Sequence, residues 1–475
     1  MRLKLKKSGL GFVFTVFECA LLLLILTGCA KTNIRTLKPS FELPAEFSAQ
    51  GAGQMPDKWW QSLNDPGLDA LIEQSLRDNF TIRSAWDRLT QAEQTVIKAN
   101  ASSFPEVTYQ GSAKRTRQET SGNKTYTSNY TAGLIASYEV DLWGRIKSSQ
   151  QAAVLDAQAA QQNVNSAAMT LTAVIAKTWY QLAEAKLQED IIRRQIETNN
   201  KILEVIKLQF RQAQVGAADV FSQEQLVQSS MGQLIQVQEN MTLIQNQLSI
   251  LTGKIPGQWW SDQKMEMITL GQLPTIDVPA VVIQRRPDVI SAYKAVQAAD
   301  QRVAYAIADQ YPSLSLSSTI ETSAARVRDL FDDWFVNLAA NLTGPIIDAG
   351  YRKAEAERAR AVLSEKMNDY SQVVLKALQE AEDAMSQEYY QRQYVENLQK
   401  QLSLARNVYN QTYQNYLKGK LDYLRVLAAL VSMQSLEQNE LIARRLLIER
   451  RIDVCRSIAG GWQLPRPESA QMTTE

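Results

Sequence analysis

Histidine is absent from the 475 residues of this chain. The sequence therefore lacks the commonest general base and the commonest transition-metal ligand, and an enzyme would have to work with carboxylates, tyrosine or lysine. An excess of one charge is lacking too, since 51 Lys and Arg residues face 50 Asp and Glu residues. This balance gives no reason to expect a nucleic-acid partner. We expect no enzymatic activity, no metal site and no cofactor.

Cysteine is scarce, and the three present are Cys19, Cys29 and Cys455. Cys19 would be removed with an N-terminal export signal and Cys29 would be lipidated, so Cys455 has no partner for an intramolecular disulfide in the mature chain. An exported chain of this composition has to be stabilised by packing. We expect Cys455 to be an ordinary small residue, buried or half-buried.

Residues 1–28 have the pattern of a lipoprotein signal peptide. A basic start is followed by the apolar stretch "FVFTVFECALLLLIL" and then by Leu26-Thr27-Gly28-Cys29, which is typical of a bacterial lipobox. In that interpretation the peptide is cut before Cys29, and Cys29 is acylated. Ala30 rather than aspartate follows it, which favours delivery to the outer membrane. The alternative is an uncleaved membrane anchor, in which Glu18 would be an awkward charge.

Proline is missing from two long spans, residues 106–255 and 346–464. Apolar residues recur every three or four positions in both spans, which predicts helices. In the first span they are Val164, Ala168, Leu171, Ile175, Trp179 and Leu182, and in the second Tyr370, Val374, Ala377, Ala381 and Ala384. A helix from Arg145 to about Ala213 would be roughly 100 Å long at 1.5 Å per residue. Alanine-rich seams of this length favour coiled-coil-like packing of neighbouring helices.

Each long helix is predicted to reverse near a glycine, in "QVGAADV" around Gly216 and in "LKGKLDY" around Gly419. Glycine suits a reversal because it adopts positive φ without a steric cost. The products are two helical hairpins, over residues 145–253 and 350–459.

Four shorter segments alternate between apolar and polar residues, at about 104–115, 128–142, 311–322 and 333–346. Segments of about ten residues with this alternation are typical of transmembrane β-strands. The alternative is a half-buried sheet in a soluble sandwich. The segments "KRTRQETSGNKT" and "TSAARVRDLFD" are expected to form the external loops between the strands.

The two halves of the chain repeat each other. Pro105 and Pro312 are 207 positions apart (312 − 105), as are Asp141 and Asp348 (348 − 141). Gly216 and Gly419 are only 203 apart (419 − 216), which predicts that four residues are lost from the second long helix. Each half contains a helix, a strand pair, a long helix and a return helix, and this order predicts a duplication.

The predicted domains follow from this repeat. They are the signal peptide 1–28, an acylated linker and equatorial segment 29–64, the first repeat 65–260, a connecting segment 261–289, the second repeat 290–462 and a tail 463–475. Four strands cannot close a barrel, and an open edge in lipid leaves backbone groups unsatisfied. The chain must therefore form oligomers. Two copies would give eight strands and three copies twelve, and periodicity alone does not choose between them.

The motifs of the chain, taken in order, resemble the outer-membrane efflux protein family (TolC-like), in its NodT-type lipoprotein branch. The matching stretches are "KWWQSLNDPGLDALIEQSLRDN", "SYEVDLWGR", "RRPDV", "YPSLSLS" and "GPIIDAGYRKAE", which cover essentially the whole mature chain. Tyr293 departs from the family, which often carries Glu there. The resemblance implies an α+β membrane protein, a homotrimer with a twelve-stranded transmembrane β-barrel to which each protomer gives four strands. The barrel would continue into a long periplasmic α-helical barrel with a mixed equatorial belt.

The resemblance also implies a function. The trimer would be the exit duct of a tripartite efflux system, in contact with outer-membrane lipid, a periplasmic adaptor protein and an inner-membrane pump. It would passively conduct drugs, metal ions or other small solutes across the outer membrane. The alternative is a non-conducting structural lipoprotein that tethers the outer membrane to periplasmic partners. Amphipathic strands and an internal repeat favour the duct, because a tether needs neither.

Two short segments are predicted to be the joints where membrane strands become periplasmic helices. The first is Trp143-Gly144-Arg145, and the second contains Gly350 and Arg352. Glycine permits the change of dihedral angles, Trp143 suits an interfacial position, and the arginines are expected in headgroups or water. The alternative for Trp143 is an ordinary core residue.

The hairpin tips would form the closed, adaptor-facing mouth, as the resemblance implies, and Tyr416-Leu417-Lys418-Gly419 is similar to a YxxG turn of the family. Relatives commonly place an aspartate two turns into the return helix, where this chain has Ser222 and Arg425, six residues past the glycines. Asp219 and Asp422 lie three past each glycine.

The charged residues at the second tip suggest a gate. Asp422 and Arg425 are three apart, which would allow them to form an ion pair on one helix face. We expect Tyr416, Asp422 and Arg425 to help hold the mouth shut. The alternative is a solvated pair at an exposed turn.

Overall fold

The computed structural model describes two compact units of the chain, each taken by itself below. The described residues are 41–47, 58–257, 265–273, 277–460 and 462–467. The strand unit contains Ala92–Ala157 and Lys294–Asp369, and the helical unit contains Phe41–Gln91, Gln158–Tyr293 and Tyr370–Glu475. Cys29, the proposed site of acylation, lies outside the described residues.

The same order of elements occurs in each half of the chain: a helix pair, a strand pair, a long helix and a return helix. The short 3₁₀-helix η1 (Trp59–Leu63) comes first. The first half then has α2 (Pro66–Asp78), α3 (Phe80–Ala101), β1 (Glu106–Thr120), β2 (Asn123–Val140), α4 (Arg145–Arg211) and α5 (Ala217–Leu251). The second half has α6 (Pro279–Arg285), α7 (Pro287–Ala308), β3 (Ser313–Ala324), η2 (Val327–Asp329), β4 (Trp334–Thr343), α8 (Tyr351–Leu417) and α9 (Tyr423–Ile458).

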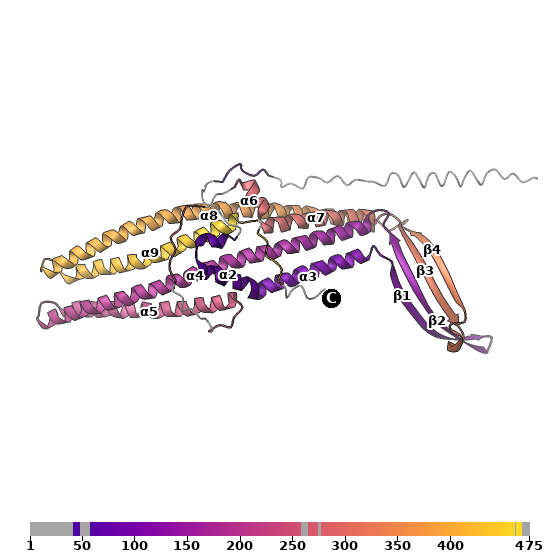
Figure 1. Ribbon diagram of the computed structural model, residues 1–475, viewed down its shortest axis with the longest axis horizontal. Coiled ribbons are helices and arrows are strands. Elements are labelled where there is room, and N and C mark those ends of the chain that lie inside the picture. The colour runs from indigo at the N-terminus through magenta and orange to yellow at the C-terminus, as the bar shows by residue number, and fades with distance from the viewer. Residues whose placement is uncertain (1–40, 48–57, 258–264, 274–276, 461, 468–475) are drawn as a thin grey trace, which may run out of the picture. The chain divides into compact units, whose positions relative to one another are not determined.

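The strands form one antiparallel sheet in the order β1-β2-β3-β4 (Figure 1). The register places Tyr109, Leu134, Ile320 and Val336 in a single row across the four strands. Because side chains in a strand point alternately to opposite faces, the members of each such row share a face. The predicted alternation is therefore aligned from strand to strand.

The connection between β1 and β2 corrects one prediction. Residues 114–125 were expected to form an external loop, but the ladder continues to the pair Thr120 and Asn123. The turn contains only Ser121 and Gly122, with φ of 50° and 84°. Two central residues with positive φ are what a tight hairpin turn requires. β1 thus ends at Thr120 instead of 115, and β2 begins at Asn123 instead of 128.

Two strand ends were predicted too late. β2 ends at Val140 and β4 at Thr343, whereas the expected ends were 142 and 346. Pro345 has no backbone N–H and cannot extend the ladder. Asp141 instead contributes to the start of the next helix. The loop between β3 and β4 begins later than predicted, because β3 continues to Ala324 instead of 322, and η2 lies within this loop.

The long helices α4 and α8 each contain 67 residues (Figure 1). All six apolar positions whose spacing predicted the first helix are buried, from Val164 to Leu182, and in the second helix Val374, Ala377, Ala381 and Ala384 are buried. The predicted helices and their buried faces are confirmed. Among the described residues, no helix has both the length and the apolar character needed to cross a membrane.

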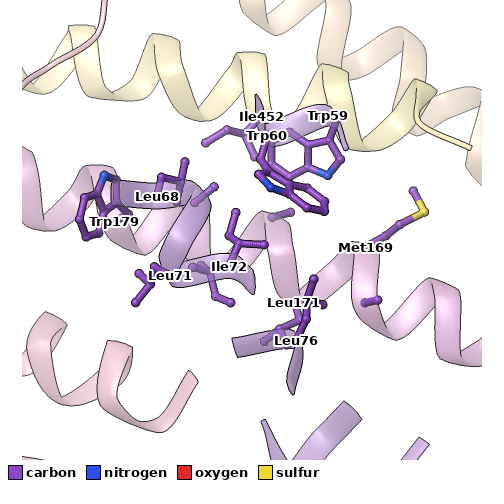
Figure 2. Close-up of a cluster of buried hydrophobic side chains, with 14 of the residues drawn as sticks. Trp59, Trp60, Leu68, Leu71, Ile72, Leu76, Met169, Leu171, Trp179 and Ile452 are labelled. Carbon is purple, nitrogen blue, oxygen red and sulfur yellow. The ribbon is translucent and has the colours of Figure 1, made fainter. Parts of the chain in front are cut away.

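The core of the helical unit is built around the two tryptophans of η1 (Figure 2). Trp59 and Trp60 are fully buried against residues of α2, α4 and α9. Asp65 caps α2 through the N–H groups of its first turn, and it also accepts hydrogen bonds from Trp179 Nε1 at 2.8 Å and Tyr180 Oη at 3.3 Å. Burial and the neighbouring Asp65 raise the pKa of Tyr180. This one carboxylate therefore ties α2 to α4.

A buried ion pair joins α8, α9 and the connecting segment. Arg451 contacts the Glu388 carboxylate through Nη2 at 2.7 Å, and the two side chains are only 7% and 1% exposed. Arg451 also donates to the carbonyls of Gly271 and Gln272, both at 3.0 Å. The connecting segment is thereby fixed to the second hairpin.

Cys455 is fully buried in the same core, as predicted. Burial raises the pKa of its thiol to about 12. A thiol with such a pKa is almost entirely protonated near neutral pH and therefore unreactive. Its role is packing.

Candidate functional site

The sheet has one apolar and one polar face. The apolar face contains the row of Tyr109, Leu134, Ile320 and Val336, and the polar face contains the row of Glu139, Ser315 and Asn341. Leu134 is 50% exposed and Leu338 is 77% exposed, so the described part of the chain leaves this apolar face uncovered. Apolar and polar residues alternating in this way are the pattern of strands with lipid on one side and water on the other.

The sheet also has two open edges. β1 and β4 each pair with only one neighbour within the described chain. An unpaired edge presents a row of free N–H and C=O groups, which is a template for pairing with another strand. In lipid such an edge costs several kcal/mol per unsatisfied group. The isolated sheet is therefore unsuited to a membrane until its edges are paired.

A glycine on the polar face allows three strands to pack closely. Gly133 lies between Gln110 on β1 and Glu321 on β3 in one row. A Cβ at Gly133 would lie 2.6 Å from the carbonyl oxygen of Ile320, so a larger residue does not fit. Gln110 Nε2 donates to Glu321 Oε2 at 3.1 Å, across the intervening strand.

The strand-to-helix joints are built on two equivalent aspartates, Asp141 and Asp348. Asp141 accepts hydrogen bonds from the N–H groups of Ile146 at 3.1 Å and Lys147 at 2.8 Å. Asp348 likewise accepts from two N–H groups at the start of α8, at 3.0 and 3.2 Å. These N–H groups lower the pKa of Asp348. Each carboxylate satisfies amides that the first turn of a helix leaves free.

Positive φ angles occur at both joints, as predicted for the glycines. Gly144 has φ of 75° in the first joint. In the second joint Ala349 and Gly350 have φ of 51° and 85°. The change from extended to helical backbone is therefore made through left-handed residues, which favour glycine.

The arginines of the joints, expected in headgroups or water, are partly exposed and also form an ion-pair network. Arg145 contacts Glu139 at 2.7 Å and donates to the Tyr305 hydroxyl at 3.0 Å. The hydrogen bond to Glu139 raises the pKa of Arg145. Asp309 lies between the two joints, 3.3 Å from Arg352 and 3.9 Å from Arg145. One carboxylate thus links the two halves of the chain.

Trp143 links the first joint to β3. Its ring stacks on Tyr311 with 4.9 Å between centroids, and its Nε1 donates to the carbonyl of Pro312 at 2.7 Å. The side chain is 37% exposed, so the core alternative is wrong. A polar cavity of about 350 Å³ lies between the joints. Its lining includes Glu139, Asp141, Arg145, Asp309, Tyr311 and Arg352.

The hairpin tips correct the predicted alignment of the halves. Ala213 with φ of 57° and Gly419 with φ of 67° occupy the same place in the two turns, 206 positions apart (419 − 213). The caps of the return helices, Gly216 and Asp422, are also 206 apart (422 − 216). Gly216 is therefore the counterpart of Asp422 and not of Gly419. The second long helix has not lost four residues.

Both aspartates at the tips accept backbone N–H groups at the start of a return helix, Asp422 as the N-cap of α9 and Asp219 from the third position of α5. Asp422 accepts the backbone N–H of Arg425 at 3.1 Å, and Asp219 accepts the N–H of Gly216 at 3.1 Å. The described contacts of Arg425 include no ion pair with Asp422, so that part of the prediction is wrong. An aspartate at the N-cap directs its carboxylate to the free amides of the first turn.

Tyrosines join the two hairpins near their tips. Tyr416 donates to Gln209 of α4, and Tyr423 donates to the buried Gln223 of α5. The two rings contact each other, with 5.8 Å between centroids. Burial raises the pKa of Tyr423, and the neighbouring Tyr416 and Asp219 add to this effect. Tyr416, predicted at this site, is thus a contact between hairpins.

A buried polar seam continues from the tip. Asn199 Nδ2 donates to Ser230 Oγ at 3.1 Å, and Gln434 Nε2 donates to Asn199 Oδ1 at 2.9 Å. All three side chains are buried. Sequence reasoning missed them because polar residues in a helix normally mark its solvent side. Their helical spacing from buried apolar residues could have identified them. Asn199, for example, lies on the same helix face as Ile202, Leu203 and Ile206.

The main features of the described chain are thus an uncovered amphipathic sheet and two long helical hairpins. The profile of the family described as "Outer membrane efflux protein" matches residues 71–254 and 278–460, and the chain belongs to that family. It is therefore a protein of the outer membrane that extends into the periplasm.

Two named proteins and one solved structure illustrate the similarity of this chain to known outer-membrane proteins. The chain is 26% identical over 467 residues to the pyoverdine export outer membrane protein OpmQ of Pseudomonas aeruginosa, with 93% of this chain and 96% of OpmQ covered. It is 25% identical over 467 residues to the cation efflux system protein CusC of Escherichia coli O6:H1, with 93% and 97% covered. Among solved structures, the outer-membrane channel OprN superposes with a TM-score of 0.83 at 25% identity, covering 90% of this chain and 99% of OprN.

Proposed function

We propose that this chain is the outer-membrane exit duct of a tripartite efflux system. The observation that carries the proposal is the four-stranded sheet with one exposed apolar face and two open edges. Lipid would cover the apolar face, and strands of neighbouring copies would pair with the edges. The duct would work with a periplasmic adaptor protein and an inner-membrane pump, the other two components of such a system.

The number of strands favours a homotrimer. Barrels of about eight strands are just wide enough inside for their own side chains, and wider barrels hold open channels. Two copies of this sheet would give a filled barrel, whereas three copies give twelve strands around a lumen. The long helices would continue this wall as a periplasmic α-helical barrel.

The repeat of elements supports an origin by duplication. Each half contains its own helix pair, strand pair and hairpin, and the family profile matches once in each half. A duplicated unit gives each protomer two similar portions of the wall.

The proposed cargo is a class of small solutes. The relatives are named for export of pyoverdine in one case and efflux of cations in another, at nearly equal identity to this chain. A duct of one architecture that works with different pumps would account for this variety of exported solutes. Drugs, metal ions and other small solutes remain the proposed range.

Single-channel recording tests the duct. Purified protein added to a planar lipid bilayer should produce discrete current steps. The competing function is a structural lipoprotein that tethers the outer membrane, and it would insert without any current. Absence of current from inserted protein would therefore overturn the duct and favour the tether.

The same recordings test the proposed gate at the hairpin tips. Replacing both Asp422 and Arg425 by alanine removes the N-cap of α9 from each protomer. The first turn of α9 should then fray, so the closed mouth should loosen and the conductance should rise. A matched control replaces the exposed ion pair of Glu197 and Lys201 on α4. Conductance and ion selectivity equal to wild type in the tip variant would show that these residues form only a solvated turn.

Lipidation of Cys29 is the proposed second attachment to the membrane. An acyl chain adds about 0.8 kcal/mol per buried CH₂. The variant Cys29→Ala should lose labelling by radioactive palmitate and be processed more slowly, while trimers still form. Undiminished labelling of this variant would contradict the lipobox.

A further inference from the structure

The β1–β2 hairpin continues beyond the apolar band of the sheet. On the apolar face this band ends at the pair Ala113 and Tyr130. β1 has 15 residues and β2 has 18, whereas β4 has only 10. About 9–11 residues are enough for a strand to cross the hydrocarbon layer. The end of the hairpin therefore projects past it, at the end of the sheet opposite to the joints.

Basic residues occupy the apolar-face positions of this projection. Arg115 and Arg117 continue the column of Ala113 on β1, and Lys124 lies on the same face of β2, paired with Glu119. We name Arg115, Arg117 and Lys124 the basic collar. With Glu119 included, this face carries a net charge of +2 per protomer.

The collar is held on the sheet but left open to its surroundings. The Arg115 guanidinium lies over the Tyr126 ring, 5.4 Å from its centroid. Arg117 donates to Glu119 through Nη2 at 2.9 Å, and both side chains remain about half exposed. A guanidinium has five N–H donors, so most of those of Arg117 are available to a further acceptor.

The β3–β4 loop has no comparable excess of positive charge. Arg326 and Arg328 both contact Asp329, and Asp332 and Asp333 follow. The positive charge at this end of the sheet is therefore concentrated on one hairpin, and three of its four cations, all except Lys114, lie on one face.

We propose that the basic collar binds the phosphate groups of the phosphorylated glycolipid in the outer leaflet. The proposal rests on the proposed function, which puts the apolar face in lipid and the β1–β2 turn outside. At about 3.3 Å per residue the collar begins about 7 Å beyond the end of the apolar band and spans about 13 Å, in the headgroup layer. Arginine forms bidentate hydrogen bonds with phosphate oxygens. Tyr126 and Tyr130, on the same face of β2, suit an interfacial aromatic girdle.

The test compares two charge removals on the same hairpin. Arg115→Gln together with Arg117→Gln changes the collar, and Lys114→Gln is the matched control, because Lys114 lies between them in sequence but on the polar face. Purified protein is titrated with fluorescent lipopolysaccharide and with the same glycolipid after enzymatic removal of its phosphates. The double variant should bind the phosphorylated form roughly thirtyfold more weakly, the usual effect of two surface cations at an anionic membrane. The control should bind like wild type.

Three results would each overturn the proposal that the collar binds phosphate. The first is binding by the double variant as tight as that by wild type, and the second is a loss of affinity in the Lys114→Gln control as large as that in the double variant. The third is binding of the phosphate-free glycolipid by wild type as tight as binding of the phosphorylated one. Bilayer currents from the same samples separate this proposal from the duct. Normal currents with unchanged binding overturn the collar alone, and phosphate-dependent binding without any current overturns the duct alone.

Discussion

Replacing Leu134 by arginine is expected to abolish most of the assembled oligomer. Leu134 lies on the apolar face, in one row with Tyr109, Ile320 and Val336. A cation on the lipid side of a barrel costs about 2–4 kcal/mol near the midplane. Every copy in the oligomer bears this cost, so the proposed trimer is destabilised by about three times this amount. Leu338→Arg should behave in the same way, and the oligomer is measured by gel mobility without boiling.

Ser315→Arg is the matched control for these variants. Ser315 lies on the polar face between Glu139 and Asn341, where water would fill the lumen. The oligomer of this variant should be as abundant as that of wild type. Equal loss of oligomer from Ser315→Arg and Leu134→Arg would contradict the assignment of the two faces.

Glu388→Gln is expected to destabilise the helical unit by about 3–5 kcal/mol, because it leaves Arg451 buried without its counter-ion. Glu388 is the only carboxylate among the described contacts of Arg451, whose other partners are the carbonyls of Gly271 and Gln272. The loss is measured as the change in the free energy of unfolding, from denaturant titrations followed by helical circular dichroism.

An exposed pair gives the control for this variant. Glu355 contacts Arg358 at 2.6 Å on the surface of α8, and surface pairs contribute about 0–1 kcal/mol. Glu355→Gln should therefore change stability very little. The double variant Glu388→Met with Arg451→Met should lose less than Glu388→Gln alone, because no charge is left buried. A loss in Glu388→Gln as small as that in Glu355→Gln would show that the buried pair does not anchor the connecting segment.

The long helices and the faces of the sheet could be predicted from sequence because each depends on a local period. Val164 and Ile175 recur at the helical spacing, and Leu134 and Tyr138 alternate at the strand spacing. Such a period can be recognised in a sequence wherever a helix or strand is long and one side of it is apolar. The lipobox motif added the lipid anchor, and the family resemblance added the trimer and the partners; all three remain proposals.

Two features could not be predicted, each for a physical reason. The outer half of the β1–β2 hairpin is charged on one face and so lacks the apolar alternation that marks a strand. Asp309 serves both joints only because the fold brings α7 between them, and its counterpart in the first half is Ser102.

The predicted alignment of Gly216 with Gly419 was wrong because glycine was assumed to mark the same position in both turns. Ala213 adopts the left-handed conformation that Gly419 adopts in the other hairpin, with φ of 57° against 67°. The left-handed region costs an alanine about 1–2 kcal/mol, which the surrounding turn can supply. Asp422 then caps α9, and this explains why it does not pair with Arg425.

The central claim is that copies of this chain close a barrel by pairing β4 of one copy with β1 of the next. Disulfide cross-linking across these edges tests it most directly. Thr108→Cys on β1 is combined in turn with cysteine at Asn337, Ala339 or Asn341 on β4, all on the polar face, and the protein is oxidised in outer membranes. At one register the account predicts a ladder of covalent species that ends at the trimer, while Thr108→Cys with Thr319→Cys on the inner strand β3 gives none. A ladder that ends at the dimer, or monomer alone at every register, would contradict the account.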